Sequence, residues 1–253
     1  MSSILQLRMT NIKLTIEYHG LPYSGWQSQK NEKTVQDEVQ KAIFKFSGEK
    51  KIIQGAGRTD AGVHALAQCA NFTLEKEFSE YQILSGINFH LGNEKIKITQ
   101  VEKVDDDFNA RFTAKLKTYH YQIYNSISPS VLQDEISVHI RQPLDIDAMR
   151  EAIQNFIGKH DFSSFRARGC QAKTPIRSIN KTDIVQEDKK ITFIFQAQSF
   201  LYQQIRIMVG SLLEVGLNNQ KPSWIAYLLN QKNRSLAGPT MPSKGLLLKD
   251  IQY

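Results

Sequence analysis

The sequence predicts an α+β fold made of two ferredoxin-like halves that share one continuous, mostly antiparallel sheet flanked by helices. Alternating apolar and polar residues indicate strands, and apolar residues three or four positions apart indicate helices between them. Over the first hundred residues these segments follow the order β-α-β-β-α-β. The pattern begins again after the triplet Asp105–Asp107, loosely and with an insertion, and no low-complexity linker intervenes. We therefore expect halves at 1–104 and 105–253.

The elements of the first half are bounded by recognisable turn and capping signals. Thr34 and Asp37 have the spacing of a capping box. Tyr23 and Trp26, in a turn-rich stretch, either cover the core, which is the simpler interpretation, or stack on a base. The predicted elements are a strand at 12–18, turns at 19–27, a helix after Thr34, strands on both sides of a glycine-rich loop and ending near Leu74, a helix from about Ser79, and a strand around 96–98.

The second half is predicted by the same signals. Asp105–Asp107 is most simply an exposed turn. Gly210 lies inside a helical pattern and costs about 1 kcal/mol of helix propensity, so we expect close packing there. The predicted elements are an aromatic strand at 119–124, a helix opened by Asp145, a long loop from Gly158 to Thr174, strands at 176–185 and 191–197, a helix at 201–217, a shorter helix at 224–229, and a final strand at 246–251.

Charge and cysteine content narrow the function classes. A net charge of +7 over 253 residues favours an anionic partner, nucleic acid first and a membrane surface second. Two cysteines, without a C-x-x-C or Cys/His cluster, argue against a zinc module and a disulfide scaffold and favour a reduced, cytoplasmic setting. No signal peptide is visible, and no apolar run reaches the length of a transmembrane helix, so we expect no membrane.

The glycine-rich stretch 55–64 is the leading candidate for a functional site. Three glycines in eight residues suit a tight loop between strands, and Arg58 and Asp60 are presented on it. A carboxylate in such a loop can act as general base or nucleophile if a partner keeps it ionised. Arg206, at the edge of a helix's apolar stripe, is a candidate partner. The alternatives are a structural turn in which Arg58 and Asp60 merely pair, and an ordinary surface arginine at 206.

A basic segment between Ser163 and Thr182 suits contacts with phosphates. It carries five cations and no acidic residue, and Phe162 and Phe165 lie beside the first of them. The cations are Arg166, Arg168, Lys173, Arg177 and Lys181. The alternative is a solvated basic loop. No Walker loop, dinucleotide fingerprint, nucleophile elbow, kinase motif set or metal-ligand spacing of histidines is present, so no cofactor is predicted.

The motif Gly57–His64 resembles the signature loop of the pseudouridine synthases of the TruA type. Other blocks resemble the family in the same order, so the likeness extends from about residue 11 to 253. These blocks are Tyr18 through Gln27, Asp107–Phe112, Tyr119–Tyr121, Asp161–Arg166, Arg206 through Leu212, and Gly245–Leu246. The run Tyr202–Gln204 departs from the histidine-rich form of some bacterial members, a difference that bears on substrate preference rather than on the reaction.

The resemblance implies a role for each matching residue. Asp60 corresponds to the catalytic aspartate, which attacks or deprotonates the target nucleoside, and Arg206 to the basic residue that pairs with it. Tyr119 corresponds to a tyrosine that stacks on the flipped uracil. Arg58 corresponds to an arginine that helps hold the nucleotide out of the stack, and Leu246 to an apolar residue lining the pocket.

The family also implies a reaction, a substrate and partners. The N1–C1′ bond of a uridine is broken, the uracil turns, and a C5–C1′ bond forms, without metal or organic cofactor. The substrate is tRNA, at positions 38 to 40 of the anticodon stem-loop, and members act as homodimers. Two rival hypotheses are a catalytically silent RNA-binding protein or tRNA chaperone on the same scaffold, and an aspartate-dependent nucleotide hydrolase.

Overall fold

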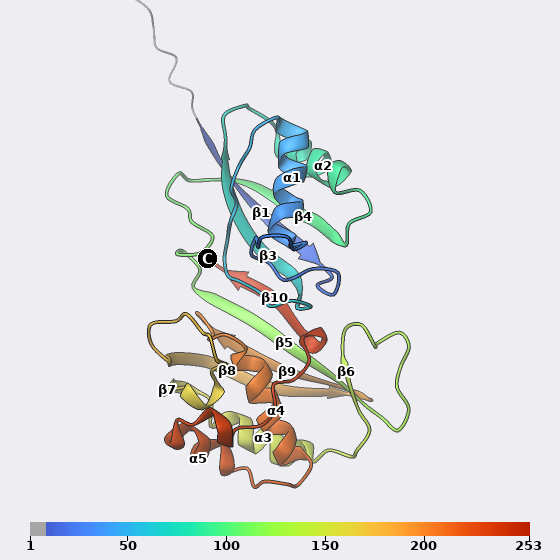
Figure 1. The fold of residues 1–253 in the computed structure, drawn as a ribbon, viewed down its shortest axis with the longest axis vertical. Coiled ribbons are helices and arrows are strands. Elements are labelled where there is room, and N and C mark those ends of the chain that lie inside the picture. Colours follow the sequence, from blue (N-terminus) through green and yellow to red (C-terminus); the bar gives the residue numbers. More distant parts are fainter. Residues whose placement is uncertain (1–8) are drawn as a thin grey trace, which may run out of the picture. The chain divides into compact units, whose positions relative to one another are not determined.

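The chain divides into two compact units in a computed structural model that describes residues 9–253 (Figure 1). Of the described residues, unit 1 contains 9–114 together with Tyr253, and unit 2 is Lys115–Gln252. Residues 105–114 belong to unit 1 because the Asn11 Nδ2 donates to the carbonyls of Asp105 and Phe108, at 2.9 and 3.0 Å. The division therefore falls after Ala114, where the sequence suggested one after residue 104.

Unit 1 has the predicted order β-α-β-β-α-β. Its sheet has the strand order β4-β1-β3, with β2 paired to β3, and all of these pairs are antiparallel. The α+β prediction is thus confirmed here. The elements are β1 (Thr10–Tyr18), α1 (Val35–Ser47), β2 (Gln54–Gly55), β3 (His64–Leu74), α2 (Glu80–Leu91) and β4 (Ile96–Val104).

Strand β2 is much shorter than the apolar run before the glycines suggested. The backbone of Ile53 is bonded to side chains of α1 instead of to a strand: its N–H donates to Gln40 Oε1 at 3.1 Å, and its carbonyl accepts from Gln36 Nε2 at 2.9 Å. Ile52 is 82% exposed. Side chains of α1 therefore fix the segment that leads into the glycine-rich loop.

The helices of unit 1 begin where the capping residues predict. The Thr34 Oγ1 accepts from the Asp37 N–H at 3.3 Å, and Ser79 forms a full capping box with Gln82. Helices α1 and α2 lie side by side (Figure 1). A Cβ at Gly86 would lie 2.1 Å from Phe46 Cδ2, so glycine there permits the close approach.

Unit 2 repeats the topology of unit 1 with insertions. Its sheet has the order β10-β5-β9-β8-β7, and β6 joins β5 in parallel. If β6, β7 and α5 are set aside, the remaining elements again read β-α-β-β-α-β. The elements are β5 (Leu116–Asn125), β6 (Val138–Ile140), α3 (Ile146–Gln154), β7 (Gly158–Asp161), β8 (Ile176–Glu187), β9 (Lys190–Ala197), α4 (Gln204–Gly216), α5 (Trp224–Gln231) and β10 (Leu246–Gln252).

Two predicted segments of unit 2 differ from the structure. The long loop contains β7 and a 3-10 turn at Ser163–Phe165. The helix expected from Leu201 begins at Gln204, because Gln203 has a φ of +58° and interrupts the helical backbone. The Gln204 side chain accepts from the Leu201 N–H at 2.7 Å and closes the turn before the helix.

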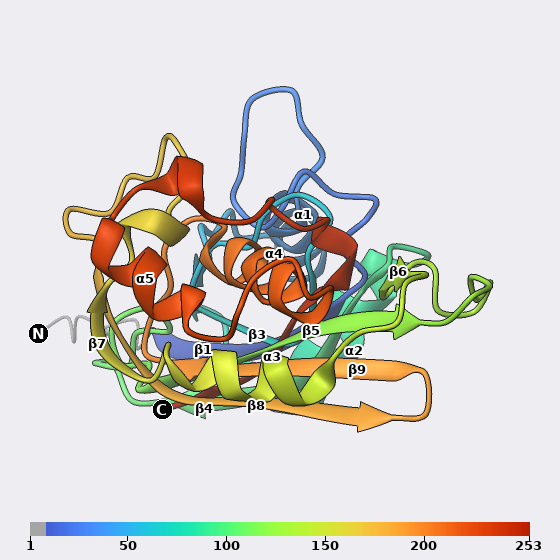
Figure 2. The same ribbon diagram turned by 90° about the horizontal axis from the view of Figure 1, so that it is seen from below.

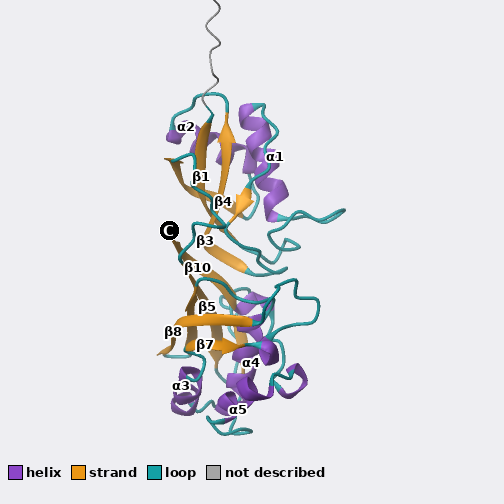
Figure 3. Ribbon diagram, turned by 90° about the vertical axis from the view of Figure 1, so that its left-hand side faces the viewer, coloured by secondary structure: helices purple, strands orange, loops and turns teal. Residues whose placement is uncertain are grey.

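The core of unit 2 lies between its sheet and its helices. Ile191, Phe193, Phe195 and Ala197 alternate along β9 and are fully buried. The Thr182 Oγ1 of β8 donates to the carbonyl of Ile153 in α3. Figure 2 shows α4 and α5 on one side of β5 and β9, and Figure 3 distinguishes the strands from the helices. Each unit is thus a sheet with helices packed against it; that the two sheets form one stays a prediction.

Candidate active site

The glycine-rich loop lies between β2 and β3, as its spacing predicts. Thr59 is buried, Asp60 is half-buried and Arg58 is exposed. The Val63 N–H donates to the Asp60 carbonyl at 3.1 Å, which closes a tight turn. Within this turn Gly62 has a φ of +78°, a conformation that favours glycine. The loop therefore presents Asp60 and Arg58 from a turn bounded by two strands.

The turn-rich segment after β1 packs against this loop. The Trp26 N–H donates to the Thr59 carbonyl at 3.2 Å, and the Gly20 N–H donates to His64 Nδ1 at 3.1 Å. A Cβ at Gly25 would lie 2.6 Å from the Thr59 carbonyl oxygen, so only glycine allows this approach. Tyr23 and Trp26 are buried, which confirms the core interpretation for both rings.

A buried polar network holds the backbone on both sides of Arg58. The hydroxyls of Tyr18 and Thr59 are 2.9 Å apart, and the Gln68 Nε2 donates to the Gly57 carbonyl at 2.9 Å. Tyr18 and Gln68 are almost fully buried. Buried hydrogen bonds of this kind restrict a loop to one conformation. Sequence reasoning missed Gln68; the available signal was a glutamine inside the apolar run of a strand.

Tyr18→Phe is expected to reduce the fall in the free energy of unfolding that the wild-type protein shows above pH 10. Burial raises the pKa of Tyr18 to about 12, while hydrogen bonds from Thr59 and Gln68 oppose this. An unfolded tyrosine ionises near pH 10, so the contribution of this phenol to folding is complete below pH 10 and is lost between pH 10 and 12. In the Tyr18→Phe protein this fall in the free energy of unfolding, on the order of 2 kcal/mol between pH 10 and 12, is absent. At lower pH the variant is less stable than the wild type by about 1 kcal/mol, because one hydrogen bond is lost.

Urea unfolding of both proteins at pH 8, 10 and 11.5 measures the difference. Tyr81→Phe changes an exposed ring of the same unit and is the control, which should follow the wild-type curve. Parallel pH curves for the Tyr18→Phe and wild-type proteins would contradict the expectation.

In unit 2, Tyr119 lies in the middle of β5, with Leu248 and Phe195 opposite it on the neighbouring strands. Its ring is buried and meets the Phe200 ring edge-on, with centroids 5.4 Å apart. Such edge-to-face pairs hold an aromatic side chain in one orientation. Tyr119 is therefore a preoriented ring on a rigid strand.

Arg206 lies in the first turn of α4, where a neighbouring segment fixes its guanidinium. Its Nε donates to the Met241 carbonyl at 2.6 Å, and the Met241 N–H donates to the Arg206 carbonyl at 3.2 Å. This segment runs against the helix because position 210 is glycine: a Cβ there would lie 1.9 Å from the Pro239 carbonyl oxygen. The close packing expected at Gly210 is thus confirmed.

The same segment leads to Leu246, which is buried at the start of β10. The Tyr121 hydroxyl donates to the Pro242 carbonyl at 2.8 Å, and a Cβ at Gly245 would lie 2.6 Å from Tyr121 Cζ. Burial raises the pKa of Tyr121, and the charge of Arg206 partly opposes that rise. Tyr121 therefore packs under the turn that connects the Arg206 contact to Leu246.

The predicted site residues fall into two groups. Arg58 and Asp60 share one loop of unit 1. Tyr119, Arg206 and Leu246 belong to unit 2 and are connected through Tyr121 and the 238–246 segment.

The basic segment forms a loop that continues into β8, where Arg177 and Lys181 lie, and two of its arginines hold it. The Arg166 Nη2 donates to the carbonyls of Cys170 and Ala172, and the Arg177 Nη1 donates to those of Thr174 and Ile176. Arg166 and Arg177 thus also have a structural use, while the other three cations of the segment, Arg168, Lys173 and Lys181, are exposed.

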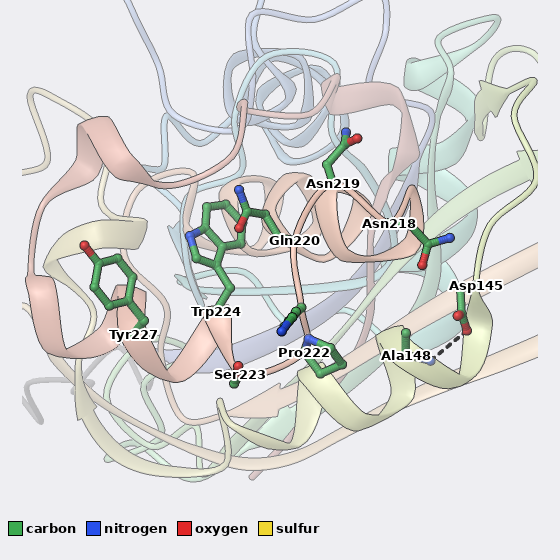
Figure 4. A pocket seen from close by; sticks show the side chains of 10 residues that line it. Asp145, Ala148, Asn218, Asn219, Gln220, Pro222, Ser223, Trp224 and Tyr227 are labelled. Carbon is green, nitrogen blue, oxygen red and sulfur yellow. Dashed lines mark hydrogen bonds between the residues drawn. The ribbon is translucent and has the colours of Figure 1, made fainter.

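A separate cavity of about 730 Å³ lies beside the start of α5 (Figure 4). Trp224, Tyr227 and the amide side chains of Asn218, Asn219 and Gln220 line it, and the Asp145 carboxylate accepts from the Ala148 N–H as the cap of α3. None of its lining residues is a predicted site residue. Over residues 9–253 no helix is long and apolar enough to cross a membrane, and no group of three His, Cys, Asp or Glu residues could hold a metal ion.

Comparisons with known proteins match nearly the whole chain. A sequence model of the family described as tRNA pseudouridine synthase matches residues 14–113 and 152–253. The tRNA pseudouridine synthase A of Wolbachia pipientis wMel is 47% identical over 242 residues, which cover 95% of this chain and 99% of that protein. The proteins of the same name from Ehrlichia canis and Acetivibrio thermocellus are 44% and 43% identical; the alignments cover 95% and 97% of this chain and 99% and 100% of those proteins.

Proposed function

This chain belongs to the tRNA pseudouridine synthase family, whose members are isomerases acting on tRNA, and on that premise we propose that it converts uridine to pseudouridine at positions 38 to 40 of the anticodon stem-loop. The observation that carries the proposal is the loop around Asp60, whose backbone is held on both sides by the Tyr18, Thr59 and Gln68 hydrogen bonds.

Asp60 is the reacting carboxylate in this proposal. It acts either at C1′ of the ribose or on the base, and both routes need an ionised oxygen that can approach the nucleotide. Arg206 pairs with Asp60 and keeps it ionised where water is excluded, as an arginine–carboxylate pair does. The N1–C1′ bond breaks, the uracil turns, C5 bonds to C1′, the C5 proton is released to solvent, and N1 takes up a proton in exchange.

Tyr119, Leu246 and Arg58 hold the target nucleotide. Extruding a base from a stem costs a few kcal/mol, and stacking on an aromatic ring returns about 1–3 kcal/mol. The buried, preoriented ring of Tyr119 supports that role, and Leu246 is a buried apolar residue on the neighbouring strand. The exposed Arg58 helps keep the base out of its stem.

The remaining features concern the setting of the reaction. Arg166, Arg168, Lys173 and Arg177 contact the RNA backbone, in keeping with recognition of RNA by shape and phosphates. The enzyme works in the cytoplasm as a homodimer, and the reaction needs neither metal nor organic cofactor, because the leaving group and the new nucleophile are two atoms of the same uracil.

Release of tritium tests the reaction. The protein is incubated with tRNA labelled at C5 of uridine, in the presence of a chelator, and label in water is measured. The proposal expects release together with pseudouridine at positions 38 to 40, mapped in the product. Binding without release would favour a silent RNA-binding protein, free uracil or cleaved nucleotide would indicate a hydrolase, and pseudouridine elsewhere would overturn the assignment of positions.

A further inference from the structure

A polar groove of about 460 Å³ lies at one end of β8 and β9 in unit 2. Its lining consists of two cations, two hydroxyls, two amides and one isoleucine: Lys115, Arg177, Ser178, Ser199, Asn180, Gln198 and Ile176. Hydroxyl and amide groups can donate hydrogen bonds, and no carboxylate is among these lining residues. The composition therefore suits an anion.

Arg177 is the residue that points to a ligand. Its Nη1 is fixed by the carbonyls of Thr174 and Ile176, at 3.0 and 2.7 Å, so the guanidinium is held in one place. Its Nε is buried and has no hydrogen-bond partner among the described residues. This donor is out of reach of solvent, so an anion in the groove would act on the guanidinium by supplying a counter-charge, which none of the lining side chains supplies. Burial lowers the pKa of Arg177, which agrees with a cation short of counter-charge.

The groove is connected to Tyr119 within unit 2. Ser199 of the groove immediately precedes Phe200, whose ring packs edge-on against Tyr119. The basic loop joins the same segment, because the Ala167 N–H donates to the Tyr202 carbonyl at 3.2 Å. A chain bound in the groove would therefore pass the segment that orients the proposed stacking tyrosine.

We propose that this groove binds a phosphodiester of the RNA backbone of the substrate, with the Arg177 guanidinium and the Lys115 ammonium as the two cations that attract its non-bridging oxygens. The inference rests on the proposed function, because that function supplies a polyanionic partner beside Tyr119. Phosphate contacts position an RNA without reading its sequence. The groove thus sets the affinity and register of the substrate and takes no part in bond breaking.

Three variants and one control test the groove. Lys115→Gln and Ser178→Asp change exposed side chains, the second by placing a carboxylate in the groove. Arg177→Gln removes the guanidinium charge, and its thermal midpoint is measured as well because Arg177 also holds the start of β8. Lys189→Gln is the control: it removes the same charge as Lys115→Gln at the other end of β8 and β9, in their connecting hairpin. Dissociation constants for tRNA are measured at several salt concentrations, with kcat from tritium release.

The expected result is a roughly tenfold weaker Kd for Ser178→Asp and Arg177→Gln, and a salt slope reduced by about 0.7 to 0.9 in Lys115→Gln, the value for one lost phosphate contact. Lys189→Gln matches the wild type in Kd, salt slope and kcat. Unchanged Kd values and slopes in all three variants of an active enzyme would overturn the groove alone. An inactive wild-type protein would overturn the proposed function instead. Saturable binding of free phosphate at low millimolar concentration that Arg177→Gln abolishes and saturating tRNA leaves unchanged would show a small-anion site and would overturn the RNA assignment.

Discussion

Asp60→Asn is expected to reduce kcat for tritium release by about 10⁴-fold or more, while the Kd for tRNA changes by less than about threefold. Asparagine has the same shape as aspartate but no ionised oxygen, so it can neither attack C1′ or the base nor accept a proton. The loop should keep its conformation, because these hydrogen bonds of the loop do not involve the Asp60 side chain. Trp26 bonds the Thr59 carbonyl, Tyr18 bonds the Thr59 hydroxyl, and Gln68 bonds the Gly57 carbonyl.

The control for this variant is Asp106→Asn, which removes an exposed carboxylate from the same unit. It should retain wild-type kcat. Single-turnover measurements at saturating enzyme separate the chemical step from binding. Turnover by Asp60→Asn above about one per cent of the wild-type rate, with circular dichroism showing a folded protein, would remove Asp60 from the reacting position.

Arg206→Gln is expected to reduce kcat by about 10²- to 10³-fold, the usual cost of losing one electrostatic stabiliser from an active site. Its effect on the Kd for tRNA should be less than about threefold, because the proposed partner is Asp60 and not a phosphate. Arg206→Lys should recover only part of the rate, since an ammonium keeps the charge but cannot form the bidentate geometry of a guanidinium.

Arg206 also supports its own segment, so the test needs a control for that role. Arg234 donates to the carbonyls of Ala237 and Gly238 and to the Thr240 hydroxyl, and thus holds the same segment from the other side. Arg234→Gln should lower the thermal midpoint to a similar extent and leave kcat nearly unchanged. Equal losses of kcat in both variants would mean that Arg206 acts only by holding the segment. Equal losses in kcat and in affinity for Arg206→Gln would indicate phosphate binding.

Most elements could be predicted from the sequence because their signals are local. Thr34, Ser79 and Asp145 each begin a helix by accepting a backbone N–H, and this depends only on residues three positions away. The misjudged elements depended on distant partners. The run before Gly55 forms almost no strand because α1 side chains bond its backbone, and β7 exists because β8 pairs with it.

The candidate site was only partly visible in the sequence. The glycine spacing indicated the loop that carries Arg58 and Asp60, and the family motifs indicated Tyr119, Arg206 and Leu246. Neither indicated Gln68, which lies on the following strand and reaches back eleven positions to Gly57. The use of Arg166 and Arg177 in holding their own loop was also not predictable, because charge patterning does not tell which carbonyls a guanidinium will meet.

By itself the sequence determined most of the order of elements, the family and the residues proposed to bear the chemistry, because hydrophobic period, helix caps and motifs depend on residues close together in the chain. Only the tertiary structure decided how those residues are held. A Cβ at Gly210 or Gly25 would collide with a segment that is distant in sequence. Tyr18 of β1 and Gln68 of β3 both bond the glycine-rich loop. The Arg177 Nε is buried without a hydrogen-bond partner only in the packed structure. Packing brings together residues that are distant in sequence, and this is where orientation and unmet hydrogen bonds are set.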